Sequence, residues 1–443
     1  MNAWMALPSP VRLSLVALAG AWVGTLASRW SARLREEEQA QRSSLRLAPG
    51  RMPSVDWLAW LPLLGAWRNA TADPRRPPRE ANRGAVQGGR RTRRLARTWR
   101  PLVVELTTAG LFAGLYGWET LRFGLVIPPL TEHGAAALAP TLFQAPLILH
   151  LVLLAFMLAA SLIDLDEKII PDEITVTGTL VGLGLMYLLP SAALPSVDWL
   201  RSGAAVVGPV HVASPGAWPA AWEGWPELGS LLLGVSCFGL WCFALLPRNW
   251  RARRGWRIAL ALCWNSIRRE RFSAAVAAMF VLGASAIGFA WMAGGERWQS
   301  LLSALVGLAV GGGIVWCVRI IGQVALGREA MGFGDVTLLA MIGVYLGWQA
   351  VLMVFFVAPF FGLALGIFQA LSARDWEIPY GPFLCLGALA VIVRWPVLWE
   401  GTRDIFAVGW LLPTTLALML VLMAVLLATW AGVKRRWLGG SVS

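Results

Sequence analysis

The sequence contains few charged and few polar aromatic or imidazole side chains. Only 14% of its 443 residues are charged, 57% are hydrophobic, and the whole chain has three histidines and four tyrosines. Globular soluble domains carry about 25% charged residues, so this composition excludes an ordinary water-soluble protein. Together with a mean hydropathy of +0.61, it predicts a polytopic membrane protein.

Several catalytic motifs are absent. The chain has no glycine-rich phosphate loop, no nucleophile elbow and no HExxH pattern, so ATP-driven transport and serine or zinc hydrolysis have no support in it. Its five cysteines lie mostly within or beside apolar runs, where free thiols behave as small hydrophobic side chains. We therefore infer neither a disulfide framework nor a metal site.

Acidic residues are outnumbered by basic ones, and the net charge is +13. The basic residues are mostly arginine and cluster in a few loops between apolar runs, a pattern that indicates control of membrane topology and not a nucleic-acid partner. Placing these loops in the cytoplasm puts the N-terminus outside and the C-terminus inside. We therefore expect a multi-pass protein of the cytoplasmic (inner) membrane, surrounded by lipid.

The apolar runs predict an all-α membrane helix bundle of about ten or eleven spans. One run, 336–347, covers only roughly 18 Å at 1.5 Å per residue, less than the ~30 Å hydrocarbon layer. It could be tilted, thinly covered or re-entrant, but counting it as a crossing places every basic loop on one side. The expected spans are 11–28, 102–118, 142–163, 174–190, 228–246, 273–294, 300–321, 336–347, 349–371, 381–398 and 406–432.

The same runs divide the chain into six stretches, and no internal repeat relates them. Two of these stretches hold the candidate catalytic acids, and a third stretch lies between those two in the sequence. The stretches are 1–28, the first span; 29–100, a basic cytoplasmic loop; 101–190, spans with the first candidate aspartate; 191–299, an insertion with an external loop, an extra membrane hairpin and a basic cytoplasmic loop; 300–398, spans with the second candidate aspartate; and 399–443, the last span and a basic tail.

Two aspartates lie at the ends of apolar runs. Asp164 directly follows the run LILHLVLLAFMLAASLI and begins the sequence DLDEKIIPD, and Asp335 opens the run VTLLAMIGVYLGW. Bringing an ionised carboxylate toward hydrocarbon costs several kcal/mol, so such acids suggest function. The expected topology places both at one membrane face. Two carboxyl groups that share a proton can act as an aspartic-protease pair, in which one activates water and the other protonates the scissile carbonyl. A capping or ion-pair role remains the alternative for Asp164.

Residues next to these aspartates suggest how the local backbone is shaped. Pro171 and Asp172 are typical of a helix start, and Asp166 is expected in a solvated turn. Gly332 and Gly334 flank a single phenylalanine, which would allow unusual backbone dihedral angles and the close approach of an extended substrate. Glycine used only for helix packing is the alternative, and it is the expected role of the three glycines at 311–313.

Three motifs together resemble the type IV prepilin peptidase family. They are DLDEKIIPD at 164–172, MGFGDVTLLA at 331–340 and IPYGPF at 378–383. The resemblance implies a polytopic aspartic endopeptidase that removes the basic leader of type IV prepilin or pseudopilin-like substrates at the cytoplasmic face. It also implies that Asp164 and Asp335 form the catalytic pair. The residues expected to bind substrate or shape the loops are Gly332, Gly334, Asp166, Pro171, Asp172, Pro379, Gly381 and Pro382.

The chain departs from the pattern of that family at several positions. Bifunctional members carry two zinc-binding CxxC pairs in the first cytoplasmic loop and methylate the product with S-adenosylmethionine. Residues 29–100 contain no cysteine, so we interpret them as a degenerate remnant of that domain and expect no zinc. Methylation with S-adenosylmethionine stays open, and proteolysis itself needs no cofactor. Thr25 and Thr337 stand where the family commonly has asparagine and lysine.

Three other interpretations remain. A protease of the presenilin or signal-peptide-peptidase kind should show a Tyr-Asp motif and a PAL motif, but Ile163 precedes Asp164 and the C-terminal third has no PAL. A non-enzymatic proton-coupled transporter could use two carboxylates, yet it should place them near mid-membrane, often in related halves. Finally, the chain could keep the fold and the two acids but act on an unusual substrate.

Overall fold

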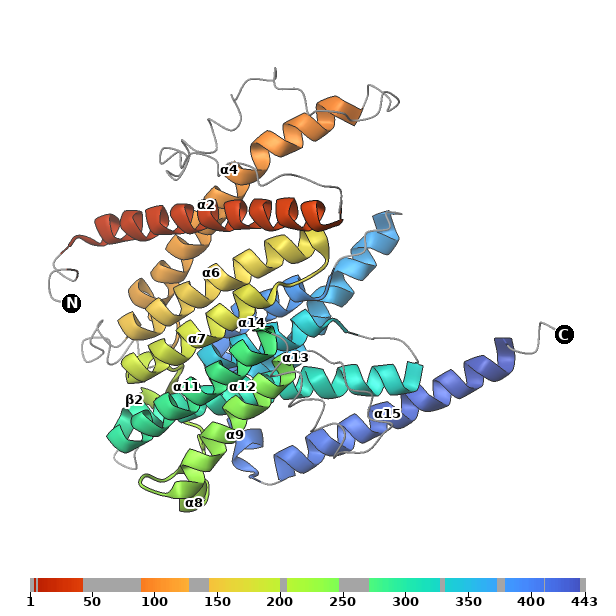
Figure 1. Cartoon of the computed structure of the whole chain (residues 1–443). Helices are drawn as coiled ribbons and strands as arrows, with labels where there is room; N and C mark the ends of the chain where they lie inside the picture. The colour runs from red at the N-terminus through yellow and green to blue at the C-terminus, as the bar shows by residue number, and fades with distance from the viewer. Residues whose placement is uncertain are drawn as a thin grey trace. The chain divides into compact units, whose positions relative to one another are not determined.

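The computed structural model of the chain divides into two compact units, which are described separately. The first unit comprises Met1–Gly124 and Leu154–Lys168, and the second comprises Leu125–Leu153 and Ile169–Ser443. The helices and strands are shown in Figure 1. The structure describes residues 4, 7–42, 89–126, 143–199, 205–246, 271–326, 331–372, 379–409 and 411–438.

The first unit is built on two helices, α2 (Ser9–Arg42) and α4 (Gly89–Tyr116), which cross each other (Figure 1). Small residues allow the close crossing, because a Cβ atom added at Gly20 would lie 2.8 Å from the Cβ of Phe112. A short π-helix, η2 (Gly117–Leu121), continues α4. Helices therefore occupy both ends of the expected loop 29–100. Its aromatic centre, residues 54–68, lies outside the described residues.

The core of the second unit is a helix pair, α12 (Gly295–Leu326) and α13 (Phe333–Ser372). A Cβ atom at Gly311 would overlap the carbonyl oxygen of Leu339 and lie 3.2 Å from Cγ2 of Val351. These two residues would be about 18 Å apart along one straight helix, so the chain must fold back between them. It does so at Gly347, whose φ of 82° and ψ of 169° are non-helical.

The turn at Gly347 confirms the expected boundary between the runs 336–347 and 349–371. The first run is a separate short helix, and both halves of α13 pack on α12. The packing role expected for the three consecutive glycines is confirmed for Gly311 and Gly312, the second of which faces Ala340. A Cβ atom at Gly313 would meet nothing within 4 Å.

Two further helices pack on α13 and determine which residues share one end of the second unit. Helix α7 (Asp172–Leu188) runs parallel to the first half of α13, since Ile170 abuts Gly334 near one end and the Tyr345 hydroxyl donates to the Gly178 carbonyl (2.8 Å) farther along. Helix α14 (Gly381–Ala407) packs on the second half of α13. The remaining long helices are α9 (Leu228–Leu245), α11 (Arg271–Ala293) and α15 (Leu411–Leu438).

The opposite end of the second unit carries an element that the sequence did not predict. Within the expected external loop, β1 (Pro195–Trp199) and β2 (Ala205–Pro209) form an antiparallel pair that aligns Pro195 with Pro209. Helix side chains hold the surrounding segment. The Trp348 indole donates to the Val212 carbonyl (2.6 Å), and the Trp395 indole donates to the Pro195 carbonyl (2.7 Å). The short helices η4 (Pro190–Ala192) and α8 (Ala220–Glu223) flank this hairpin.

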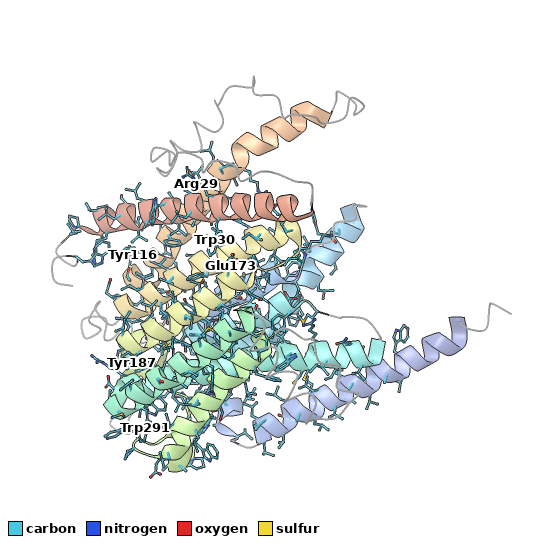
Figure 2. All side chains as sticks on the ribbon, in the orientation of Figure 1. Arg29, Trp30, Tyr116, Glu173, Tyr187 and Trp291 are labelled. Atoms are coloured by element: carbon cyan, nitrogen blue, oxygen red, sulfur yellow. The ribbon has the colours of Figure 1, made fainter. Side chains whose placement is uncertain are left out.

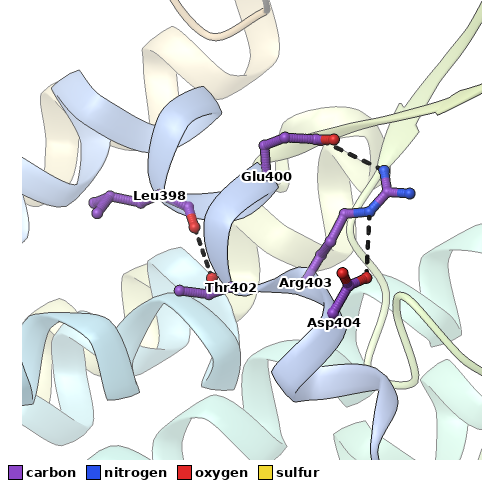
Figure 3. Close-up of polar contacts among 5 residues, drawn as sticks. All are labelled: Leu398, Glu400, Thr402, Arg403 and Asp404. Atoms are coloured by element: carbon purple, nitrogen blue, oxygen red, sulfur yellow. Dashed lines mark hydrogen bonds and ion pairs between the residues drawn. The ribbon is translucent and has the colours of Figure 1, made fainter.

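The C-terminal part of α14 contains several polar contacts (Figure 3). The Arg403 guanidinium lies 3.4 Å from Oε2 of Glu400 and 3.9 Å from Oδ1 of Asp404, and the Thr402 hydroxyl donates to the Leu398 carbonyl. All three charged residues follow the expected span 381–398. Charged groups therefore mark the point where this helix leaves its apolar stretch.

The all-α membrane bundle predicted from the sequence is confirmed. Among the described residues, eight helices are long and apolar enough to cross a membrane. That number counts α13 once although Gly347 divides it, and it omits α7, which has 17 residues, as well as α4, which holds the expected span 102–118. Several helix ends differ from the expected spans. Helix α2 continues to Arg42 and not to 28, α12 begins at Gly295 and not at 300, α14 ends at Ala407 and not at 398, and α15 begins at Leu411 and not at 406.

Candidate active-site residues

Asp335 lies at the start of α13 and is 8% exposed. Its Oδ2 accepts the backbone N–H of Gly332 at 3.2 Å. This bond is one half of a capping box, in which an acid at the third helical position satisfies an N–H at the helix start. The Thr337 hydroxyl donates to the Gly334 carbonyl at 3.1 Å. A backbone donor and the helix N-terminus thus hold the Asp335 carboxylate in one orientation.

Gly334 is required by a close contact and not by an unusual dihedral angle. Neither Gly332 nor Gly334 has a positive φ, so that expectation was wrong. A Cβ atom at Gly334 would lie 2.7 Å from the Cβ of Ile170 and 3.2 Å from its carbonyl oxygen. The close approach to Gly334 that was expected of a substrate is therefore made by Ile170 of the same chain. At Gly332 the nearest atom would be Oδ2 of Asp335, at an ordinary 3.4 Å.

The contact with Ile170 brings the second part of the DLDEKIIPD motif to the turn before Asp335. Helix α7 begins at Asp172 with Pro171 as its N-cap, which confirms the predicted helix start. Burial, and to a lesser extent the charge of Glu173, raises the pKa of Asp172 above its ordinary value. Pro171 and Asp172 therefore belong to the same end of the second unit as Asp335.

The third motif, IPYGPF, also contains a residue on which the charge of Asp335 acts, namely Tyr380. Burial, and secondly the negative charge of Asp335, raises the pKa of the Tyr380 hydroxyl to about 12. Tyr380 is the N-cap of α14, and its ring lies 6.3 Å from the Phe383 ring. Of the neighbouring positions named from the sequence, Pro379 is half-buried, while Gly381 and Pro382 are buried in the first turn of α14.

Asp164 lies in the first unit, near the end of α6 (Gln144–Glu167), and is 3% exposed. The helix ends where Lys168, with a φ of 56°, donates its N–H to the Asp164 carbonyl (2.8 Å). Asp166 still belongs to α6 and lies 2.6 Å from the Arg100 guanidinium, with side-chain exposures of 15% and 41%. The expectation of a solvated turn at Asp166 was therefore wrong, because the side chain is used to join α6 to α4.

Two buried charged residues inside long apolar helices were missed from the sequence, as was the buried Glu119 in η2. Glu105 on α4 is buried and accepts a hydrogen bond from the Thr25 hydroxyl at 2.8 Å. Arg319 on α12 is buried too, and its guanidinium carbon lies 5.7 Å from the centre of the Phe333 ring. Each interrupts an apolar run, LVVELTT and VWCVRIIG. A single charge in such a run is the signal that could have found them.

The structure thus brings the second part of DLDEKIIPD and the other two motifs to one end of the second unit, while Asp164, Asp166 and Arg100, the partner of Asp166, belong to the first. The fold and these residues define a multi-pass helical membrane protein with buried acids at helix ends. Residues 272–367 match the type IV leader peptidase family. A segment of this chain is therefore similar to that family, and the segment includes Asp335.

Individual relatives agree with the family match. A protein named "Prepilin leader peptidase/N-methyltransferase" from Burkholderia pseudomallei is 34% identical over 96 residues, which are 21% of this chain and 31% of that protein. Its namesake from Escherichia coli is 34% identical over 91 residues (20% and 40%). The one from Pectobacterium carotovorum is 38% identical over 93 residues (20% and 33%). No solved structure matches the chain.

The match is confined to a part of each protein. The chain spans about a third of the length of the Burkholderia relative, and Asp164 and the IPYGPF motif lie outside the matched residues 272–367. The matched segment begins in α11, inside the stretch 191–299 that was interpreted as an insertion from the sequence. The activity of the whole chain is therefore a matter for proposal.

Proposed function

We propose that this chain is a membrane aspartic endopeptidase that removes the leader peptide of type IV prepilin or pseudopilin-like substrates. The observation that carries this proposal is Asp335, a buried carboxylate held by the Gly332 N–H within the matched family segment. The contact between Ile170 and Gly334 adds support, since Ile170 follows Asp164 by only six residues in the sequence. Asp164 is the proposed second carboxyl group.

In the proposed reaction the two aspartates act as general base and general acid. The helix N-terminus and the Gly332 N–H favour a negative charge on Asp335, so we assign Asp335 the ionised role. It takes a proton from water as the water attacks the scissile carbonyl. Asp164 is assigned the protonated role and hydrogen-bonds the carbonyl oxygen. Proton return to the leaving amine then completes hydrolysis without a covalent intermediate.

The substrate is proposed to meet the enzyme at the cytoplasmic membrane face, where its basic leader precedes the cleavage site. Asp172 is a suitable acidic contact, because it belongs to the same end of the second unit as Asp335. Asp166 is engaged by Arg100 and is assigned a structural role. No step uses zinc or S-adenosylmethionine. Residues 43–88, which make up most of the first loop, lie outside the described residues.

A cleavage assay in membranes tests this function. A prepilin-type substrate that still carries its leader is incubated with wild type, Asp164→Asn or Asp335→Asn, each of which keeps the shape and removes the ionisable group. Wild type should cut and both variants should lose cleavage. Asp404→Asn is the matched control, because this carboxylate lies at the far end of α14 and its side chain is 96% exposed.

Cleavage that persists in either single variant would refute the two-aspartate mechanism. In that case proton-coupled transport becomes the better hypothesis for the buried carboxylates. Loss of cleavage counts only for variants that reach the membrane in wild-type amounts and elute as one species in detergent. Cleavage by Asp404→Asn shows that removal of a carboxylate is harmless elsewhere.

A further inference from the structure

A buried cation lies beside the turn that holds Asp335. Arg319 is on α12, within the candidate span Gly295–Ala325, and is 6% exposed. A charged side chain inside a membrane helix costs free energy unless the protein gives it a favourable environment, so its position requires an explanation. Neither the sequence motifs nor the proposed hydrolysis uses this residue.

The guanidinium of Arg319 faces the ring of Phe333, with 5.7 Å between the guanidinium carbon and the ring centre. This distance is within the range of cation–π attraction, which grows stronger when both groups are withdrawn from water. Phe333 is the only residue between Gly332 and Gly334, and it precedes Asp335 by two positions. The contact therefore acts on the turn that carries the candidate catalytic carboxylate.

The composition of the turn makes such a contact important. Both neighbours of Phe333 lack side chains, so its ring is the one large side chain that can anchor residues 332–334. The hydrogen bond from the Gly332 N–H to Oδ2 of Asp335, at 3.2 Å, requires this turn to keep its conformation. A displacement of about 1 Å at a catalytic group can lower the rate about 100-fold.

We propose that Arg319 is a positioning residue, which fixes the Phe333 ring by a cation–π contact and thereby holds Asp335 in its working orientation. This inference rests on the proposed function for its catalytic consequence. Its structural part, that Arg319 orders the turn before Asp335, holds independently of which reaction Asp335 performs.

The chain supplies a matched control on the same helix. The guanidinium carbon of Arg297 lies 5.8 Å from the centre of the Tyr187 ring. Tyr187 is near the end of α7 opposite to Glu173, and both residues are labelled in Figure 2. Arg297 and Arg319 are about 33 Å apart along α12. Arg297→Met therefore removes the same type of contact far from Asp335.

The experiment compares Arg319→Met, Arg319→Lys, Phe333→Leu and Arg297→Met in lipid nanodiscs. Two kinds of measurement are made: the kinetics of cleavage of a prepilin-type substrate, which give kcat and KM, and amide hydrogen exchange of a peptide covering 331–337. Arg319→Met should lower kcat roughly tenfold or more with little change in KM, and should speed exchange in 331–337. Arg319→Lys should restore part of both, and Arg297→Met should match wild type.

A merely structural role of Arg319 would reduce the amount of folded protein and leave the kcat of the folded fraction unchanged. A double-mutant cycle tests the contact itself, since Arg319→Met and Phe333→Leu should be non-additive if they remove one interaction. Additive effects, or exchange in 331–337 equal to wild type in Arg319→Met, overturn the proposal. If that variant does not fold, the same cycle is run with Arg319→Lys.

The exchange measurement separates this inference from the proposed function. If wild type cuts no prepilin-type substrate but exchange in 331–337 speeds up in Arg319→Met and not in Arg297→Met, the proposed function fails and the positioning role stands. If wild type cuts, both aspartate variants are inactive and Arg319→Met keeps the wild-type kcat, the proposed function stands and the positioning role fails.

Discussion

The contact between Gly334 and Ile170 gives the sharpest prediction from this structure. In Gly334→Ala the new methyl group would lie 2.7 Å from the Cβ of Ile170, 3.2 Å from its carbonyl oxygen and 3.3 Å from its backbone nitrogen. These atoms are not the ends of a flexible side chain, so the loop before α7 must move as a whole. Overpacking of this kind costs about 1–3 kcal/mol.

Intrinsic helix propensity acts in the opposite direction. Gly334 lies in the first turn of α13, and alanine is favoured over glycine in helices by up to about 1 kcal/mol. Without the clash, Gly334→Ala should be neutral or stabilising. A net loss of stability therefore measures the contact with Ile170, and the accompanying shift of the turn should reduce cleavage about 100-fold if it reaches about 1 Å.

Gly366→Ala, in the second half of α13, is the matched control, since its new methyl group would meet nothing within 4 Å. Thermal unfolding in detergent and the membrane cleavage assay are measured for both variants. Adding Ile170→Ala to Gly334→Ala should give no relief because it keeps the Cβ atom, whereas Ile170→Gly should give partial relief. If Gly334→Ala unfolds at the wild-type temperature and cleaves normally, the steric reasoning is wrong.

Two other positions give predictions on stability. Gly347, with φ of 82° and ψ of 169°, occupies a region reserved for glycine, so Gly347→Ala should destabilise the fold by about 1–3 kcal/mol in thermal unfolding; Gly313→Ala, with nothing near its Cβ atom, should not, and equal effects would contradict the reasoning. Burial lowers the pKa of His211 from 6.5, against the opposing charges of Glu223 and Glu296. The unfolded chain therefore binds the proton first as pH falls, and stability should decline below about pH 6.5. His211→Asn should flatten this decline in unfolding temperatures measured from pH 7.5 to 5.5, and an unchanged decline would exclude His211 as its source.

Local sequence patterns predicted the helices and their breaks well. The boundary near 347 followed from the length of two apolar runs, and the structure places a non-helical glycine there. Pro171 and Asp172 were recognised as a helix start because capping preferences depend only on adjacent residues. Periodicity and caps are local properties, so a single sequence is sufficient to reveal them.

Contacts between distant residues were beyond such patterns. Nothing near Gly334 in the sequence indicates that Ile170 will fill the space of its missing side chain. The partners of Asp166 and Glu105, which are Arg100 and Thr25, likewise come from other helices. The strands β1 and β2 were not predicted because each has only five residues. The sequence PSVDW alternates but begins with proline, and AVVGP does not alternate.

The hydrogen bonds around the β-hairpin have a consequence for the order of synthesis. The partners of Val212 and Pro195 are the indoles of Trp348 and Trp395, which lie 136 and 200 residues later in the chain. At about 5–20 residues per second, a ribosome needs roughly 10–40 s to make 200 residues. During that interval the hairpin segment has left the ribosome without the helices that hold it. The growing chain therefore passes through a period in which this segment is open to proteases and chaperones, and the period closes only when α13 and α14 are in place.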